Sequence, residues 1–150
     1  MKKLPLILCL LRAAAGILFI YSGYSKLMDP SSRFMEAIMA YQLVNLQTAS
    51  VLAAVLPWVE LFSGAFFVLG LWLQPSLYVL WGISAIFFTA ISSALLRGIP
   101  IQDCGCFGEK VHALPIQATL GIDAVLLVIF YWMHCVRKEI KKSSLDRFLE

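Results

Sequence analysis

The sequence predicts an all-α integral membrane protein, an antiparallel four-helix bundle forming a single domain over residues 1–150. Apolar residues make up 61% of the chain and charged residues only 14%. A soluble domain has about 45–50% apolar and about 25% charged residues. Four apolar stretches each approach or exceed the roughly 20 residues that cross a lipid bilayer. The net charge of +3 is modest, and no basic run with interleaved aromatics suggests nucleic-acid binding.

The first predicted span begins almost at the N-terminus. Although Met1-Lys2-Lys3 precedes its apolar run, Arg12 interrupts that run and no small-residue cleavage site closes it, so we expect a span and not a signal peptide. The four spans are predicted over residues 4–27, 49–73, 76–96 and 115–136.

Shorter elements connect these spans. Asp29-Pro30 is typical of a helix start, and helical spacing of apolar residues then predicts a short amphipathic helix over 31–43 on the outer surface. Gln74-Pro75 predicts a tight turn between the second and third spans.

Two features predict how the spans pack. Pro57 should kink the second span. Small residues at four-residue spacing in the third span, Ala85, Thr89 and Ser93, with Ala90 and Ala94 alongside, predict close helix packing, and Ala13 to Gly16 could act similarly in the first span.

The distribution of Lys and Arg predicts orientation. Positive charges dominate near both termini, which places both termini in the cytoplasm and the 28–48 and 97–114 loops outward. The terminal charges are Lys2, Lys3, Arg137, Lys138, Lys141, Lys142 and Arg147, whereas the outer set is Lys26, Arg33, Arg97 and Lys110, balanced by acidic residues.

The outward loop contains the hexapeptide Asp103-Cys104-Gly105-Cys106-Phe107-Gly108. A disulfide between cysteines one residue apart closes a small strained ring, which favours a labile, exchangeable bond over a structural one. The alternatives are two thiols without a role, or a zinc site that adds His112 and an unidentified fourth ligand.

Residues flanking the cysteines could assist exchange. His112 could generate a thiolate or carry a proton, or it could be a loop residue without a role. Asp103 would disfavour a thiolate unless a cation lies nearby. Cys9 and Cys135 are expected near the cytoplasmic ends of the first and fourth spans, where packing is favoured over a second redox pair.

Three ionisable residues lie well inside the predicted spans, away from their ends: Arg12, Glu60 and Asp123. Charges in hydrocarbon are costly, so each is a functional candidate. At about 1.5 Å rise per residue, Arg12 and Glu60 come to similar depths and could pair. The set could form a structural ion pair, or a polar pocket that binds a ligand or conducts protons.

The sequence resembles a known family. Gly16 to Leu27, followed by Asp29-Pro30, resembles the first span of DoxX-like membrane proteins, and Leu56 to Leu61 with Gly64 and Gly70 resembles the second. The Asp-Cys-Gly-Cys-Phe-Gly loop is similar to the hallmark of the methylamine utilisation protein MauE branch. The fourth span carries Gly121-Ile122-Asp123, where the resemblance leads us to expect an Arg-Asn pair in many relatives, so a ligand role for Asp123 is not inherited.

The resemblance implies a four-span membrane protein tied to thiol redox chemistry and to methylamine dehydrogenase maturation. We therefore expect Cys104 and Cys106 to exchange electrons with a periplasmic thioredoxin-like protein or a disulfide-bonded client. A quinone could accept electrons near Arg12, Trp58 and Glu60, although no motif specifies one. Quinone-linked disulfide oxidases carry two cysteine pairs, whereas this chain has one. The alternatives are a non-catalytic assembly factor and a small transporter with a central polar pocket.

Overall fold

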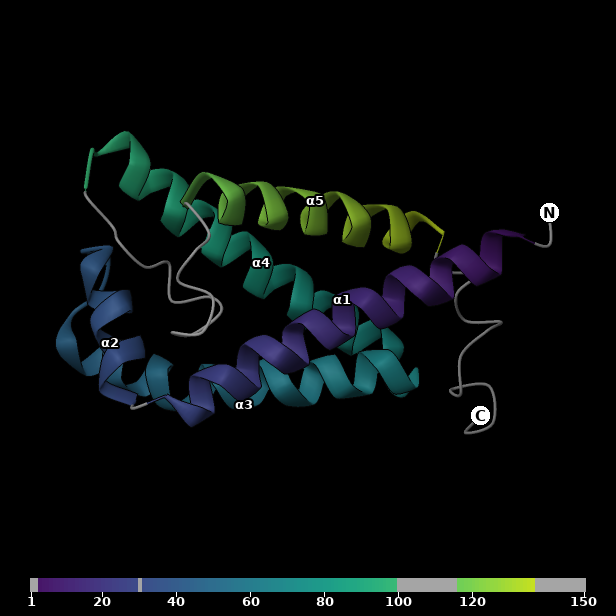
Figure 1. Ribbon diagram of the computed structural model, residues 1–150, viewed down its shortest axis with the longest axis horizontal. Coiled ribbons are helices and arrows are strands. Elements are labelled where there is room, and N and C mark those ends of the chain that lie inside the picture. Colours follow the sequence, from purple (N-terminus) through teal and green to yellow (C-terminus); the bar gives the residue numbers. More distant parts are fainter. Residues whose placement is uncertain (1–2, 30, 100–115, 137–150) are drawn as a thin grey trace.

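The computed structural model describes residues 3–29, 31–99 and 116–136, and throughout these ranges the regular structure is helical (Figure 1). Four of the helices are long and apolar enough to cross a membrane, which confirms the predicted four-span all-α fold. The helices are α1 (Lys3–Met28), α2 (Ser31–Ala40), α3 (Leu46–Leu69), α4 (Leu73–Leu96) and α5 (Ile116–Cys135).

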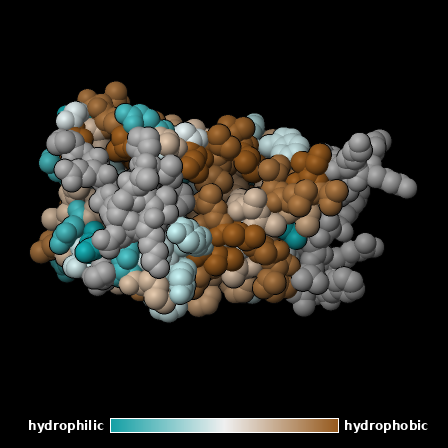
Figure 2. Space-filling model, viewed as in Figure 1, coloured by the Kyte–Doolittle hydropathy of each residue, from teal (hydrophilic) through white to brown (hydrophobic). Residues whose placement is uncertain are grey.

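The four long helices run along the length of the molecule, with α1 against α3 and α4 against α5 (Figure 1). The start of α1 and the end of α5 lie at one end, here called the terminal end. The opposite end carries α2 and is called the α2 end. Figure 2 shows apolar side chains over the middle of the visible face and hydrophilic ones gathered at the α2 end. This distribution fits a bundle that crosses a lipid bilayer.

Each long helix buries one stripe of residues at alternating three- and four-residue spacing, the pattern of helices packed nearly parallel. In α1 the stripe is Leu8, Arg12, Ala15, Phe19, Ser22 and Lys26. In α3 it is Ala49, Ala53, Pro57, Glu60, Gly64 and Phe67. In α5 it is Thr119, Asp123, Leu126, Phe130 and Met133. Charged residues therefore occupy core positions in three spans.

Glycines bring α1 and α3 into backbone contact. A Cβ added at Gly16 would lie 3.0 Å from the Gly64 carbonyl oxygen, and one at Gly23 would lie 2.7 Å from the Pro57 carbonyl oxygen. Because no larger residue fits at either place, these contacts fix how far the two antiparallel helices are shifted along each other. The expected kink at Pro57 stays a prediction.

The turn between α3 and α4 lies earlier than predicted. Gly70, with φ of 74°, ends α3 in the left-handed conformation, and α4 already begins at Leu73. Gln74-Pro75 therefore lies in the first turn of α4, where proline is tolerated because the early backbone N–H groups need no helical partner. At its other end α3 starts three residues before the prediction, since the Asn45 side chain accepts a hydrogen bond from the Thr48 N–H at 2.9 Å.

The small residues of α4 form the expected close packing only in part: Ala94 is buried, whereas Ala85 and Ser93 are half-buried. Thr89 is exposed, and its hydroxyl donates to the Ala85 carbonyl oxygen of its own helix at 2.9 Å. The buried face of α4 instead passes through Leu77, Leu80 and Ser84. Close contact is achieved by α1 and α3, where Gly16 acts as expected.

The predicted amphipathic helix is α2, and it packs across α3 near the end of α1. Phe34 on its inner face is buried, while Arg33 and Glu36 are exposed. Tyr41, just after α2, packs into a small apolar cluster with Ile91 and Ala94 of α4. The α2 helix is thus a cover on one end of the bundle.

Candidate functional site

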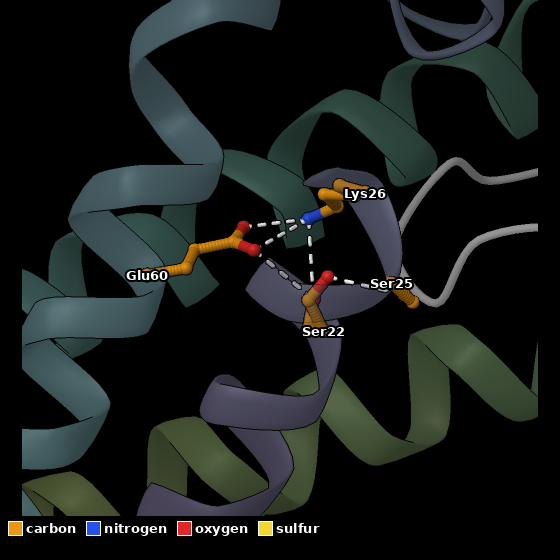
Figure 3. Close-up of polar contacts among 4 residues, drawn as sticks. All are labelled: Ser22, Ser25, Lys26 and Glu60. Carbon is orange, nitrogen blue, oxygen red and sulfur yellow. Dashed lines mark hydrogen bonds and ion pairs between the residues drawn. The ribbon is translucent and has the colours of Figure 1, made fainter. Parts of the chain in front are cut away.

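A fully enclosed ion pair joins α1 and α3 (Figure 3). The ammonium nitrogen of Lys26 lies 2.6 Å and 2.7 Å from the two carboxylate oxygens of Glu60. Glu60 is 0% exposed and Lys26 is 4% exposed. Lys26 also donates to the Ser22 hydroxyl at 3.2 Å, and that hydroxyl donates to Glu60 at 3.1 Å. The three side chains form a closed polar network inside the apolar bundle.

Two aromatic rings complete the surroundings of the Lys26 ammonium. Phe34 of α2 and Phe87 of α4 each lie 4.8 Å from Nζ, measured to the ring centroid. The negative face of an aromatic ring attracts a cation at this distance. Four helices therefore contribute to a single ammonium environment, which we call the ammonium cage: Ser22, Phe34, Glu60 and Phe87, with Lys26 as its occupant.

The expected pairing of Arg12 with Glu60 is wrong, because Lys26 takes that place. Arg12 is buried near the terminal end, where Nη2 donates to the Val68 carbonyl oxygen at 3.5 Å. Its guanidinium lies against Gly70, at the C-terminus of α3. A cation there is favoured by the negative end of the helix dipole. Lys26, which the charge distribution assigned to the outer surface, is instead a core residue.

The other candidates within the spans lie apart from one another. Trp58 is 49% exposed and stacks on Phe62 of the same helix. Two residues along an α-helix differ by about 200° in direction, so Trp58 and buried Glu60 face different ways. Asp123 is buried in the stripe of α5. A quinone held jointly by Arg12, Trp58 and Glu60 stays a prediction.

The cysteine motif lies outside the described residues, as do Asp103, His112 and the alternative zinc ligands. The structure does describe both flanks of this segment. Arg97, just after α4, donates to the Tyr41 carbonyl oxygen beside α2. Ile116, the first residue of α5, packs against the apolar cluster that contains Tyr41. Both flanks are therefore anchored at the α2 end.

Cys9 and Cys135 are free, exposed thiols. The expectation that they fill space in the helix core is wrong, because neither side chain is buried. They lie in the first part of α1 and at the last residue of α5, and both therefore belong to the terminal end (Figure 1). Arg97 and Ile116, the described flanks of the cysteine segment, lie at the opposite end.

Sequence reasoning missed three members of the ammonium cage, Ser22, Phe34 and Phe87, and its occupant Lys26. Spacing was the available signal for two of them. Ser22 and Lys26 continue the Arg12, Ala15, Phe19 series, so both fall on the buried face of α1. The two aromatic residues carry no comparable signal, because an apolar residue on the buried face of a helix is ordinary packing.

Comparison with known proteins identifies the chain at the family level. No curated protein and no solved structure matches it. The family model of the methylamine utilisation protein MauE matches residues 3–136, which include all five helices and the cysteine motif. The wider link to DoxX-like proteins stays a prediction. With four helices able to span a membrane and a match over most of its length, the chain belongs to the methylamine utilisation protein MauE family.

Proposed function

We propose that this protein is a membrane thiol–disulfide redox protein of methylamine utilisation, and that Cys104 and Cys106 are its exchanging pair. One observation carries the proposal: the chain places two cysteines one residue apart in the segment that joins two membrane spans, α4 and α5. A bond between such close cysteines closes almost no loop, so it would stabilise the fold little. Reversible exchange is the chemistry that this spacing favours.

The exchange needs no further co-reactant when the partner is a protein dithiol. A partner thiolate attacks one sulfur of the Cys104–Cys106 disulfide and forms a mixed disulfide, releasing the other cysteine as a thiolate. The second partner thiol then attacks the mixed disulfide. The partner leaves as a disulfide, and this chain gains two electrons and two protons. The same steps in reverse oxidise this chain and reduce the partner.

Two neighbouring residues have proposed roles in this exchange. His112 would accept the proton of the attacking thiol and return it to the leaving thiolate, because an imidazole titrates near neutral pH. Asp103 would stabilise the imidazolium that forms when His112 has taken up that proton. The partner would be a thioredoxin-fold protein or a disulfide-bonded client.

The described flanks of the cysteine segment bear on the proposed orientation in the membrane. Arg97 and Ile116 both contact the group around Tyr41, so the described residues on either side of the cysteine segment lie near α2. We propose that this end faces the periplasm of the inner membrane and that both termini are cytoplasmic, following the excess of Lys and Arg near the termini. An oxidising compartment would allow the disulfide to persist.

Paired serine substitutions test the proposal. In a host that depends on this chain for growth on methylamine, Cys104→Ser with Cys106→Ser should abolish growth while the protein still accumulates in the membrane. Cys9→Ser with Cys135→Ser is the matched control, because it removes two exposed thiols from the other end of the bundle, and growth should be unchanged. Normal growth of the first variant would exclude the redox function and leave a non-catalytic assembly factor or a transporter.

A further inference from the structure

The ammonium cage supplies an acceptor for each N–H donor of a primary ammonium ion. Such an ion has three N–H donors and no acceptor. The Lys26 ammonium is within hydrogen-bond distance of three oxygens, two from Glu60 and one from Ser22, at 2.6, 2.7 and 3.2 Å. The rings of Phe34 and Phe87 add attraction for the positive charge. Figure 3 shows the polar groups converging on Nζ from two helices.

Helix packing alone does not explain this arrangement. The register of α1 and α3 is already fixed by backbone contacts at Gly16 and Gly23, on the same pair of helices. A buried ion pair is a poor source of stability, because desolvating two charges offsets most of their attraction. Two apolar residues would close the space at lower cost. The cage therefore contains more ammonium-recognising groups than the fold requires.

The occupant lies close to the end of its helix. Lys26 lies in the last turn of α1, which ends at Met28, at the α2 end of the bundle. A lysine near a helix end can extend its four-carbon chain toward the water interface. The cover over the cage on that side is the ten-residue helix α2, through Phe34.

We propose that Ser22, Phe34, Glu60 and Phe87 form a binding site for a small primary alkylammonium ion, and that Lys26 is its displaceable internal occupant. The ligand would bring the same NH3 group with its three donors, and its short alkyl group would take the place of the last carbons of the lysine. The inference does not depend on the thiol chemistry of Cys104 and Cys106, so either proposal can fail alone.

Competition between Lys26 and the ligand sets the expected affinities. A ligand binds only the fraction of molecules in which the cage is free, and its apparent affinity falls by that fraction. If Lys26 occupies the cage for about 90–99% of the time, removing its ammonium should tighten ligand binding by about 10- to 100-fold.

The test is equilibrium binding of radiolabelled methylammonium to the purified full-length protein in lipid nanodiscs. Wild type should bind one ion per chain saturably, Lys26→Ala should bind it at least tenfold more tightly, and Glu60→Gln should lose binding. Tetramethylammonium has no N–H donors and should not compete. Glu36→Gln is the matched control, because it removes an exposed carboxylate of α2 and should leave binding unchanged.

Two further measurements keep the test decisive if a core variant folds poorly. Phe87→Leu leaves the ion pair intact and should weaken binding by about two- to thirtyfold through loss of the ring. Methylammonium should also raise the unfolding temperature of Lys26→Ala more than that of wild type. Binding to Lys26→Ala but not to wild type would overturn the proposal, since the lysine would then be a fixed part of the core. Binding that survives Glu60→Gln would overturn it as well.

Discussion

The pair formed by Lys26 and Glu60 should behave as one energetic unit. Both side chains are almost entirely enclosed, and their charged atoms lie 2.6 Å apart. Replacing Lys26 by Met leaves the Glu60 carboxylate buried without its countercharge, and replacing Glu60 by Leu leaves the ammonium equally isolated. Each single substitution should reduce the free energy of unfolding by about 3–5 kcal/mol.

The double substitution should cost much less than either single one. With both charges gone, the site becomes apolar like its surroundings, and such replacements are often neutral or stabilising by about 1–4 kcal/mol. The hydroxyl of Ser22 loses two partners but can donate to a carbonyl oxygen of its own helix, which limits the remaining cost to about 1 kcal/mol.

Denaturant unfolding of the detergent-solubilised protein, followed by circular dichroism, measures this double-mutant cycle. The expected coupling between the two substitutions is at least about 3 kcal/mol. Glu36→Gln on the exposed face of α2 is the control and should change stability by less than about 0.5 kcal/mol. If the costs of the two single substitutions simply add in the double variant, the two charges do not depend on each other and the reasoning fails.

Two other predictions concern helix contacts. Gly23→Ala places a methyl group 2.7 Å from the Pro57 carbonyl oxygen and 2.9 Å from the Leu61 nitrogen, so it should destabilise the protein by about 1–3 kcal/mol in the same unfolding assay. Gly121→Ala adds a Cβ with no atom within 4 Å and should stabilise α5 by up to about 1 kcal/mol. If the two substitutions changed the free energy of unfolding equally, the close packing of α1 against α3 would be contradicted. Arg97→Gln removes the hydrogen bond to the Tyr41 carbonyl oxygen and should speed amide hydrogen exchange in residues 31–40. Exchange in α5 should be unchanged. Unaltered exchange in α2 would show that Arg97 does not anchor this helix.

The spans were predictable because the physical rule behind them is simple. A helix that crosses hydrocarbon must be apolar for about 20 residues, and few other features produce such runs. The residues at which each helix begins and ends were harder to predict. Gln74-Pro75 has turn-forming residues, yet the chain turns at Gly70, since proline also suits the first turn of a helix. The sequence signal for the start of α3 at Leu46 is Asn45, whose side chain caps the helix, but the prediction from the apolar run begins only at residue 49.

The polar core was only partly predictable. Glu60 and Arg12 were correctly singled out as charges inside spans, but their partners depend on how far one helix is shifted along another. An estimate of depth from the number of residues along each span assumes that α1 and α3 enter the membrane at the same level. The glycine contacts instead set Glu60 opposite Lys26, near the end of α1. Such a shift is a property of packed surfaces and cannot be counted along one chain.

The proposed function requires that Cys104 and Cys106 alternate between a disulfide and two thiols. Alkylation with a mass-tagged maleimide in sealed membranes measures this directly when Cys9 and Cys135 are replaced by Ser. We expect no tagged cysteines per chain after incubation with an oxidised thioredoxin-fold partner and two after incubation with the reduced partner. A count that stays the same under both conditions would contradict the account.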